Sequence, residues 1–251
     1  WVIRVSRFQR DSGAEVTSAL ASALSDGEVR GIVLDVRNNP GGVMNASVEM
    51  AGNFLDGGLV VYTQGRHPDS VNTFNAEAGE VIPGVPLVVL VNGGSASASE
   101  IVAGALQDRG RAVIMGTQSF GKGSVQTVLP VSESKALKLT TALYYTPSGR
   151  SIQQDGIVPD VVVERARLTS LEQGQRLREA DLNGSLVNKG VEQEVETEVI
   201  ASLREEDNQL YEAFTLLKGI NVYRDLTDKA GSTASLEAPE NQDAETGVST
   251  N

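Results

Sequence analysis

The chain has 251 residues, of which 40% are hydrophobic and 22% charged, so it is long enough for one substantial core and ordinary for a globular protein. Its formal net charge of -12 argues against nucleic acid as a partner, because phosphate groups would be repelled. There is no cysteine and a single histidine, His67, which excludes a thiol nucleophile, a disulfide framework and a zinc site built from several histidines.

The sequence offers no candidate membrane segment. No stretch approaches the roughly eighteen consecutive apolar residues that a spanning helix needs. The chain opens on Trp1 and not on methionine, and it passes at once into a strand-like run, so no signal peptide is visible. We therefore expect a processed or truncated piece of a longer protein.

Up to about residue 165, short apolar runs alternate with amphipathic stretches. The β-branched runs predict buried strands, whereas apolar residues at helical spacing, such as Val16, Leu20 and Leu24, predict helices. In chain order we expect helix 15–24, strand 31–37, helix 44–54, strand 86–91, helix 97–107 and strand 112–115. Strands, turns and helices in series indicate a sheet with parallel pairs that helices cover.

The pattern then changes in the second half of the chain. Residues 125–131 and 137–145 alternate without a helical period and predict antiparallel or edge strands, whereas 147–149 predicts a turn and 157–163 a last short strand. Beyond residue 165, Glu, Gln, Leu and Arg dominate. The stretch 195–217 there predicts an amphipathic helix with Val199, Leu203, Leu210 and Phe214 at its apolar positions. From residue 229 onward almost nothing is apolar, which predicts a disordered acidic tail.

Two glycine-bearing turns fall where a predicted strand passes into a helix. The first covers residues 37–42 (RNNPGG) and the second residues 93–100 (GGSASASE). Ligands gather at such carboxyl ends of strands, where backbone N–H groups are unpaired and the helix dipole adds partial positive charge. Two such turns side by side could hold a negatively charged oxygen atom, as in an oxyanion hole.

Ser97 begins the helix that follows the second turn. With Glu100 three residues later it has the form of a capping box, which is the commoner role for a serine at a helix start. A nucleophilic serine gains from the same helix dipole, so capping and catalysis do not exclude each other. The residues alone leave both roles open.

A nucleophilic serine needs a base, and two side chains compete for that role. His67 stands in a polar run with no flanking apolar pattern, as a solvated loop histidine does. Lys122 is flanked by glycines and by Phe120, so we expect it in a partly apolar cleft. Loss of water around a lysine ammonium favours the neutral amine, which can take the serine proton.

Two further motifs are incomplete. Gly116-x4-Gly121-Lys122 begins like a phosphate-binding P-loop, but Gly123 replaces the hydroxyl residue that would hold magnesium, and a strand is predicted where a P-loop opens a helix. Ser132-x-x-Lys135 matches one motif of penicillin-binding enzymes, but the companion motifs are absent and the segment predicts a hairpin turn. Neither nucleotide binding nor penicillin-type chemistry is favoured.

The combined pattern resembles the carboxy-terminal processing peptidases, or tail-specific proteases, of the S41 serine peptidase family. The matching segments are 34–42, 94–101, 103–108, 116–126, 145–152 and 156–160. The serine block (SASASE) followed downstream by Phe-Gly-Lys-Gly-x-Val-Gln is highly specific. The resemblance covers residues 1–165 well, and the helical region ending near 210–213 also looks like the C-terminal part of bacterial members.

The resemblance implies a role for each matching position. It implies that Ser97 is the nucleophile, that Lys122 is the general base and that Gln126 orients this base. The oxyanion hole is implied to use the amide of Ala98 together with one from the first turn. The candidates in that turn are Gly41 and Gly42.

The expected fold is α/β: a mixed β-sheet core of crotonase- or ClpP-like strand–turn–helix units, a helical C-terminal extension and a disordered tail. The expected domains are a catalytic core over 1–165, the extension over 166–228 and the tail over 229–251. No metal and no organic cofactor is implied. The resemblance further implies protein or peptide substrates cleaved near their C-termini, a bacterial periplasmic or envelope location, and an adaptor lipoprotein as a candidate partner.

Members of this family usually carry a PDZ domain before the core, which binds the substrate's C-terminal carboxylate and gates the dyad. Nothing here resembles that domain, and we expect truncation. The alternative from another class is a noncatalytic binding module, because crotonase-type folds use similar paired amides to bind acyl thioesters or apolar ligands. The pairing of Ser97 with Lys122 and Gln126 favours the peptidase, because binding alone does not need it.

Overall fold

The first of two sheets is entirely parallel and carries the predicted strand–turn–helix series. The structure, a computed structural model, describes residues 1–67, 69–167 and 202–234. The five strands are, in spatial order, β1 (Val2–Arg4), β2 (Ile32–Asp35), β5 (Leu87–Val91), β6 (Val113–Gly116) and β9 (Val161–Val162). The intervening helices are α1 (Ser12–Asp26), α2 (Met44–Gly52) and α3 (Ala98–Asp108). The predicted α/β class with parallel pairs is confirmed.

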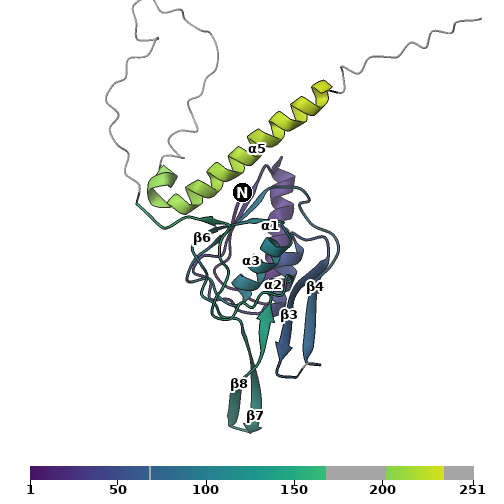
Figure 1. The fold of residues 1–251 in the computed structure, drawn as a ribbon, viewed down its shortest axis with the longest axis vertical. Helices are drawn as coiled ribbons and strands as arrows, with labels where there is room; N and C mark the ends of the chain where they lie inside the picture. Colours follow the sequence, from purple (N-terminus) through teal and green to yellow (C-terminus); the bar gives the residue numbers. More distant parts are fainter. Residues whose placement is uncertain (68, 168–201, 235–251) are drawn as a thin grey trace, which may run out of the picture.

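A second, antiparallel sheet packs against helices α2 and α3. Its order is β4 (Val71–Ala76), β3 (Gly58–Gly65), β8 (Lys135–Tyr145) and β7 (Ser124–Ser132). The antiparallel pair β7–β8 is as predicted, and Figure 1 shows it projecting from the body as a two-stranded arm. Strands β3 and β4 were not predicted, although the β-branched and aromatic residues of 60–63 favour a strand.

Both faces of the parallel sheet are covered, because successive side chains of a strand point to opposite faces. One face packs under the helices α1 to α3, with Leu34 and Val89 among its buried side chains. On the other face, Val33, Val88 and Leu90 form a smaller buried cluster with Ala213 and Leu217 of the C-terminal helix α5. The parallel sheet is thus held between two layers of helix.

Helix α5 spans Asn208–Ala234, and residues 202–206 form a further short helical stretch. Figure 1 shows α5 lying across the parallel sheet, with its far end projecting beyond the body. The helix runs past residue 229, where the sequence predicted that a tail begins. The start of the predicted helix, 195–201, and the rest of the predicted tail, 235–251, lie outside the described residues. Among the helices that the structure describes, none is long and apolar enough to cross a membrane.

Candidate active site

Ser97 occupies a strained backbone position immediately before α3. Its φ is 56° and its ψ is -110°, and among the described residues only Asn38 and Gln154 are the other non-glycine residues with positive φ. Such a conformation costs roughly 1–3 kcal/mol and tends to occur at functional sites. The strain singles out Ser97 among the serines of its block as a candidate for chemistry.

The buried carboxylate of Glu100 joins the serine turn to the lysine loop. Its Oε2 accepts a hydrogen bond from the Ser97 amide at 2.7 Å and another from the Lys122 amide at 2.9 Å. The two backbone nitrogens therefore lie no farther apart than the sum of these two distances. The first bond is the glutamate half of the predicted capping box. The second, which links residues far apart in the sequence, was not predicted.

The other oxygen of Glu100 fixes the start of the same loop. Its Oε1 accepts hydrogen bonds from the Ser119 hydroxyl at 2.6 Å and from the Gly121 amide at 2.7 Å. The Ser119 hydroxyl in turn accepts a bond from the Ile157 amide at 2.7 Å. Glu100 has no exposed surface, so these bonds are made away from water, where a lost partner is costly. One side chain thus organises the loop 119–122 around the serine.

The first glycine-bearing turn lies against Ser97, as the sequence predicted for an oxyanion hole. A Cβ atom on Gly41, whose φ is +96°, would lie 2.9 Å from the Ser97 Cβ and 3.0 Å from the Ala98 amide nitrogen. The Gly41 amide already donates to the Asn39 Oδ1 at 2.9 Å. By contrast, the amides of Gly42 and Ala98 have no hydrogen-bond acceptor within the described part of the chain. Of the two glycines considered, Gly42 is the better candidate donor.

Lys122 departs from the expectation in one respect. The residue is exposed, and so is its neighbour Phe120 at 65%, so the loop does not form the partly apolar cleft that its sequence suggested. No hydrogen bond joins its amine to the Ser97 hydroxyl. Gln126 lies on β7 with an exposed side chain. The structure therefore brings the backbones of Ser97 and Lys122 together and leaves the lysine amine in solvent.

The competing motifs find no support in the fold. His67 lies in the turn between β3 and β4, where its carbonyl oxygen accepts a bond from the Ser70 hydroxyl. Strand β7 begins two residues after Lys122, so the loop does not open a helix as a P-loop would. Ser132 and Lys135 flank the β7–β8 turn, as predicted. In residues 1–67, 69–167 and 202–234, no group of three acidic or histidine side chains is placed to hold a metal ion.

A strained serine at a helix start, beside a glycine turn with unpaired amides, is an arrangement typical of acyl-transfer enzymes. The model of peptidase family S41 matches residues 2–163 of this chain, and the chain belongs to that family. The predicted family is thereby confirmed.

Several named relatives share its sequence. A carboxy-terminal-processing protease of Bartonella bacilliformis is 45% identical over 224 residues, which are 86% of this chain and 51% of that protein. A carboxyl-terminal-processing protease of Synechocystis is 42% identical over 170 residues, 68% of this chain and 39% of that protein. The chain thus spans about half the length of these relatives or less.

Solved structures agree with the sequence relatives. The structure of a photosystem II D1 C-terminal processing protease is 37% identical and superposes with a TM-score of 0.61, over 65% of this chain and 42% of that one. Mature CPAF, at 14% identity and a TM-score of 0.52, shares the fold over 64% of this chain.

Proposed function

We propose that this chain carries the catalytic centre of a serine endopeptidase that uses a Ser97–Lys122 dyad. The observation that carries the proposal is the shared carboxylate of Glu100, which bonds the backbones of both residues with one oxygen atom. A lysine side chain is long enough to reach from there to the serine hydroxyl. Membership of family S41 supports the same assignment.

The reaction follows from the groups around Ser97. The neutral Lys122 amine takes the proton of the Ser97 hydroxyl as the oxygen attacks a peptide carbonyl. The amides of Ala98 and Gly42 stabilise the negative charge that develops on the carbonyl oxygen. The protonated lysine then gives its proton to the leaving amine, and a water molecule, activated by the same lysine, releases the acyl group from the serine. Gln126 orients the lysine.

Because Lys122 is exposed, a bound substrate can change the surroundings of its amine. An ammonium group in water is well hydrated, and covering it favours the neutral amine. A polypeptide lying across the loop 119–122 would cover both the amine and Phe120. The lysine would thus become an effective base mainly when substrate is present.

The names of the relatives suggest the kind of substrate. We propose protein or peptide substrates that are cleaved near their C-termini, in the bacterial periplasm or envelope, with an adaptor lipoprotein as a candidate partner. The relatives named above are carboxy-terminal-processing proteases. A chain that spans half of such proteins would supply the reacting groups, and the rest of their length would supply selection of the substrate.

The test is cleavage of β-casein, an unstructured protein, followed by mass spectrometry of the fragments. Ser97→Ala and Lys122→Ala should each lower the rate on the order of a hundredfold or more, with the thermal melt unchanged. Lys122→Arg should not restore activity, because a guanidinium stays charged. The exposed residues Ser22 and Lys135 provide the controls Ser22→Ala and Lys135→Ala, which should cleave like the wild type.

The outcomes separate the proposal from its rival. Retention of cleavage by Ser97→Ala would rule out this serine as the nucleophile. A wild-type chain that cleaves nothing and binds acyl-CoA tightly would instead favour the noncatalytic binding module.

A further inference from the structure

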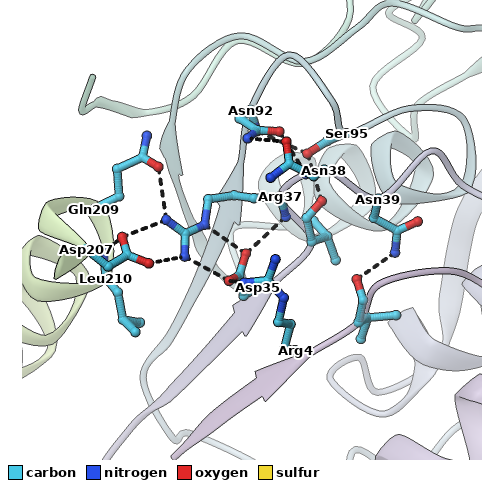
Figure 2. A network of polar contacts seen from close by, with 12 residues as sticks. Arg4, Asp35, Arg37, Asn38, Asn39, Asn92, Ser95, Asp207, Gln209 and Leu210 are labelled. Carbon is cyan, nitrogen blue, oxygen red and sulfur yellow. Dashed lines mark hydrogen bonds and ion pairs between the residues drawn. The ribbon is translucent and has the colours of Figure 1, made fainter. Parts of the chain in front are cut away.

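The guanidinium of Arg37 is held from two sides, one of them the C-terminal helix. On its own strand side, its Nε and one terminal nitrogen donate to the carboxylate of Asp35 at 2.9 and 2.8 Å. On the other side, its two terminal nitrogens donate to the two oxygens of Asp207 at 2.8 and 2.6 Å. Figure 2 shows this cluster between the end of β2 and the start of α5. Arg37 is 8% exposed, so its charge depends on these partners.

Asp207 caps the N-terminus of α5. It directly precedes the first residue of the helix, and its carboxylate accepts a hydrogen bond from the Leu210 amide at 3.1 Å. Gln209 adds a third contact to Arg37 at 3.0 Å and ties the helix to the Val163 carbonyl at 2.7 Å. Among the described side chains of α5, Ala213 and Leu217 are buried against the sheet, and Leu210 and Leu216 pack there partly buried. The hydrogen bonds from Arg37 to Asp207 and Gln209, here called the polar clamp, add to these apolar contacts and fix the first turn of the helix.

Arg37 is the first residue of the turn 37–42, which contributes to the candidate oxyanion hole. The next residue, Asn38, has φ 55°, and its amide donates to the Asn92 side chain at 2.9 Å. The carbonyl of Asn39 accepts bonds from the Ala96 amide and the Ser99 hydroxyl, both at 2.9 Å. The middle of the turn is therefore hydrogen-bonded to the serine block, and Arg37 fixes the turn where it follows strand β2.

We propose that Asp207 is a positioning residue for the oxyanion hole. By holding Arg37, its carboxylate on the C-terminal helix keeps the turn 38–42 in register with Ser97, so that the Gly42 amide meets the developing oxyanion. The inference rests on the proposed peptidase function. It makes the helix, which lies beyond the segment matched to the family, a part of the active-site support.

The test compares two ion pairs that α5 makes with the body. Asp207→Asn removes the charge opposite Arg37 and keeps the shape. Asp225→Asn removes the exposed pair with Arg30, at 2.9 Å, elsewhere on the same helix. With the wild-type chain, the principal β-casein cleavage site is first identified. A peptide of that site then serves as substrate, and a boronic acid of its acyl half serves as a tetrahedral mimic that needs the oxyanion hole.

A positioning role predicts a specific pattern. Asp207→Asn should lower kcat on the order of tenfold to a hundredfold with KM nearly unchanged, and it should weaken boronate binding by the same factor. The affinity of the peptide for Ser97→Ala should change by less than about twofold when Asp207→Asn is added, because ground-state binding does not use the oxyanion hole. Asp207→Glu should recover part of kcat, and Asp225→Asn should match the wild type.

Each other outcome is decisive. If Asp207→Asn lowers only the thermal melt and leaves kcat and boronate affinity unchanged, Asp207 is a structural anchor and the inference is wrong. If the unsubstituted chain neither cleaves nor binds the boronate, the peptidase function fails and takes the inference with it. Should Asp207→Asn not fold, Gln209→Ala tests the same clamp more gently, and it should lower kcat and boronate affinity together by several-fold.

Discussion

Replacing Glu100 by glutamine tests whether one buried side chain holds the serine turn and the lysine loop together. All four of its partners donate: the amides of Ser97, Gly121 and Lys122 and the hydroxyl of Ser119. A carboxylate can accept from all four. The glutamine amide can accept only through its one oxygen, and its NH₂ group must face two of the donors.

The magnitude follows from the better of the two amide orientations. With its oxygen toward Ser97 and Lys122, the amide keeps those two bonds as weaker, neutral ones. The Gly121 amide and the Ser119 hydroxyl proton then lose their acceptor. Hydrogen bonds to charged groups contribute about 1.5–3 kcal/mol each, so the loss of two destabilises the fold by roughly 3–6 kcal/mol. For a chain of this size, that corresponds to a fall in Tm of roughly 6–24 °C.

Thermal melts followed by circular dichroism, together with urea unfolding, measure this loss directly and need no assumption about activity. The matched control is Glu80→Gln, whose carboxylate accepts one bond, from Arg111 at 2.6 Å, and should cost much less. Cleavage by Glu100→Gln should also fall, because the loop 119–122 is released on one side. A Glu100→Gln chain that melts within about 2 °C of the wild type would refute the account of Glu100 as the joining residue.

Three further predictions concern glycines and acid stability. A Cβ on Gly41 would lie 2.6 Å from the Ala96 carbonyl oxygen, so Gly41→Ala should lower cleavage on the order of a hundredfold. Gly79→Ala, with φ +113° and open space around it, carries similar backbone strain and should leave cleavage intact; equal losses in both would contradict the close packing. A Cβ on Gly116 would lie 2.1 Å from the Val91 carbonyl oxygen, so Gly116→Ala should separate β5 from β6, and a wild-type Tm would contradict this contact. Burial pushes the pKa of Asp207 up, but hydrogen bonds from Arg37 and the Leu210 amide, with the Arg37 charge, outweigh it and hold the pKa below its usual 3.8. A carboxylate whose pKa is lower in the folded than in the unfolded state stabilises the fold above the unfolded-state pKa, and this stabilisation is lost as the pH falls through the folded-state pKa. The urea concentration at the unfolding midpoint should therefore decrease below about pH 4, and it should decrease less steeply in Asp207→Asn. Parallel curves for the two proteins would contradict this.

The parallel strands were predictable because a strand buried on both faces has to be apolar throughout. The run at Leu87–Val91 illustrates this, since all five residues are apolar and buried. The last predicted strand was harder, and only Val161–Val162 pairs as β9. Pro159 has no amide hydrogen to donate to a ladder, which limits pairing before that point. Strands β3 and β4 were not predicted, because β4 is mostly polar and exposed and the strand-favouring residues of β3 run directly into the polar turn at His67.

In the candidate site, contacts between residues close in the sequence were predictable, and contacts between distant segments were not. The relation of Ser97 to Glu100 lies within one helical turn and could be predicted from spacing alone. The bonds from Glu100 to the loop 119–122 join segments that no local pattern connects. Lys122 was expected in a partly apolar cleft because of its sequence neighbours, and this was wrong, since the residue is exposed. Burial of a loop depends on which other segments lie over it. The contact between Arg37 and Asp207 was equally hidden.

The layered sheet has a practical consequence for anyone who shortens this protein. The family match ends at residue 163, which would be a natural place to cut. A chain ended there would expose the apolar side chains of Val33, Val88 and Leu90 to water. It would also remove Asp207 and Gln209 from Arg37 and leave Asp35 as the partner of the guanidinium. A shortened chain that keeps this face of the sheet covered therefore has to extend beyond Leu217.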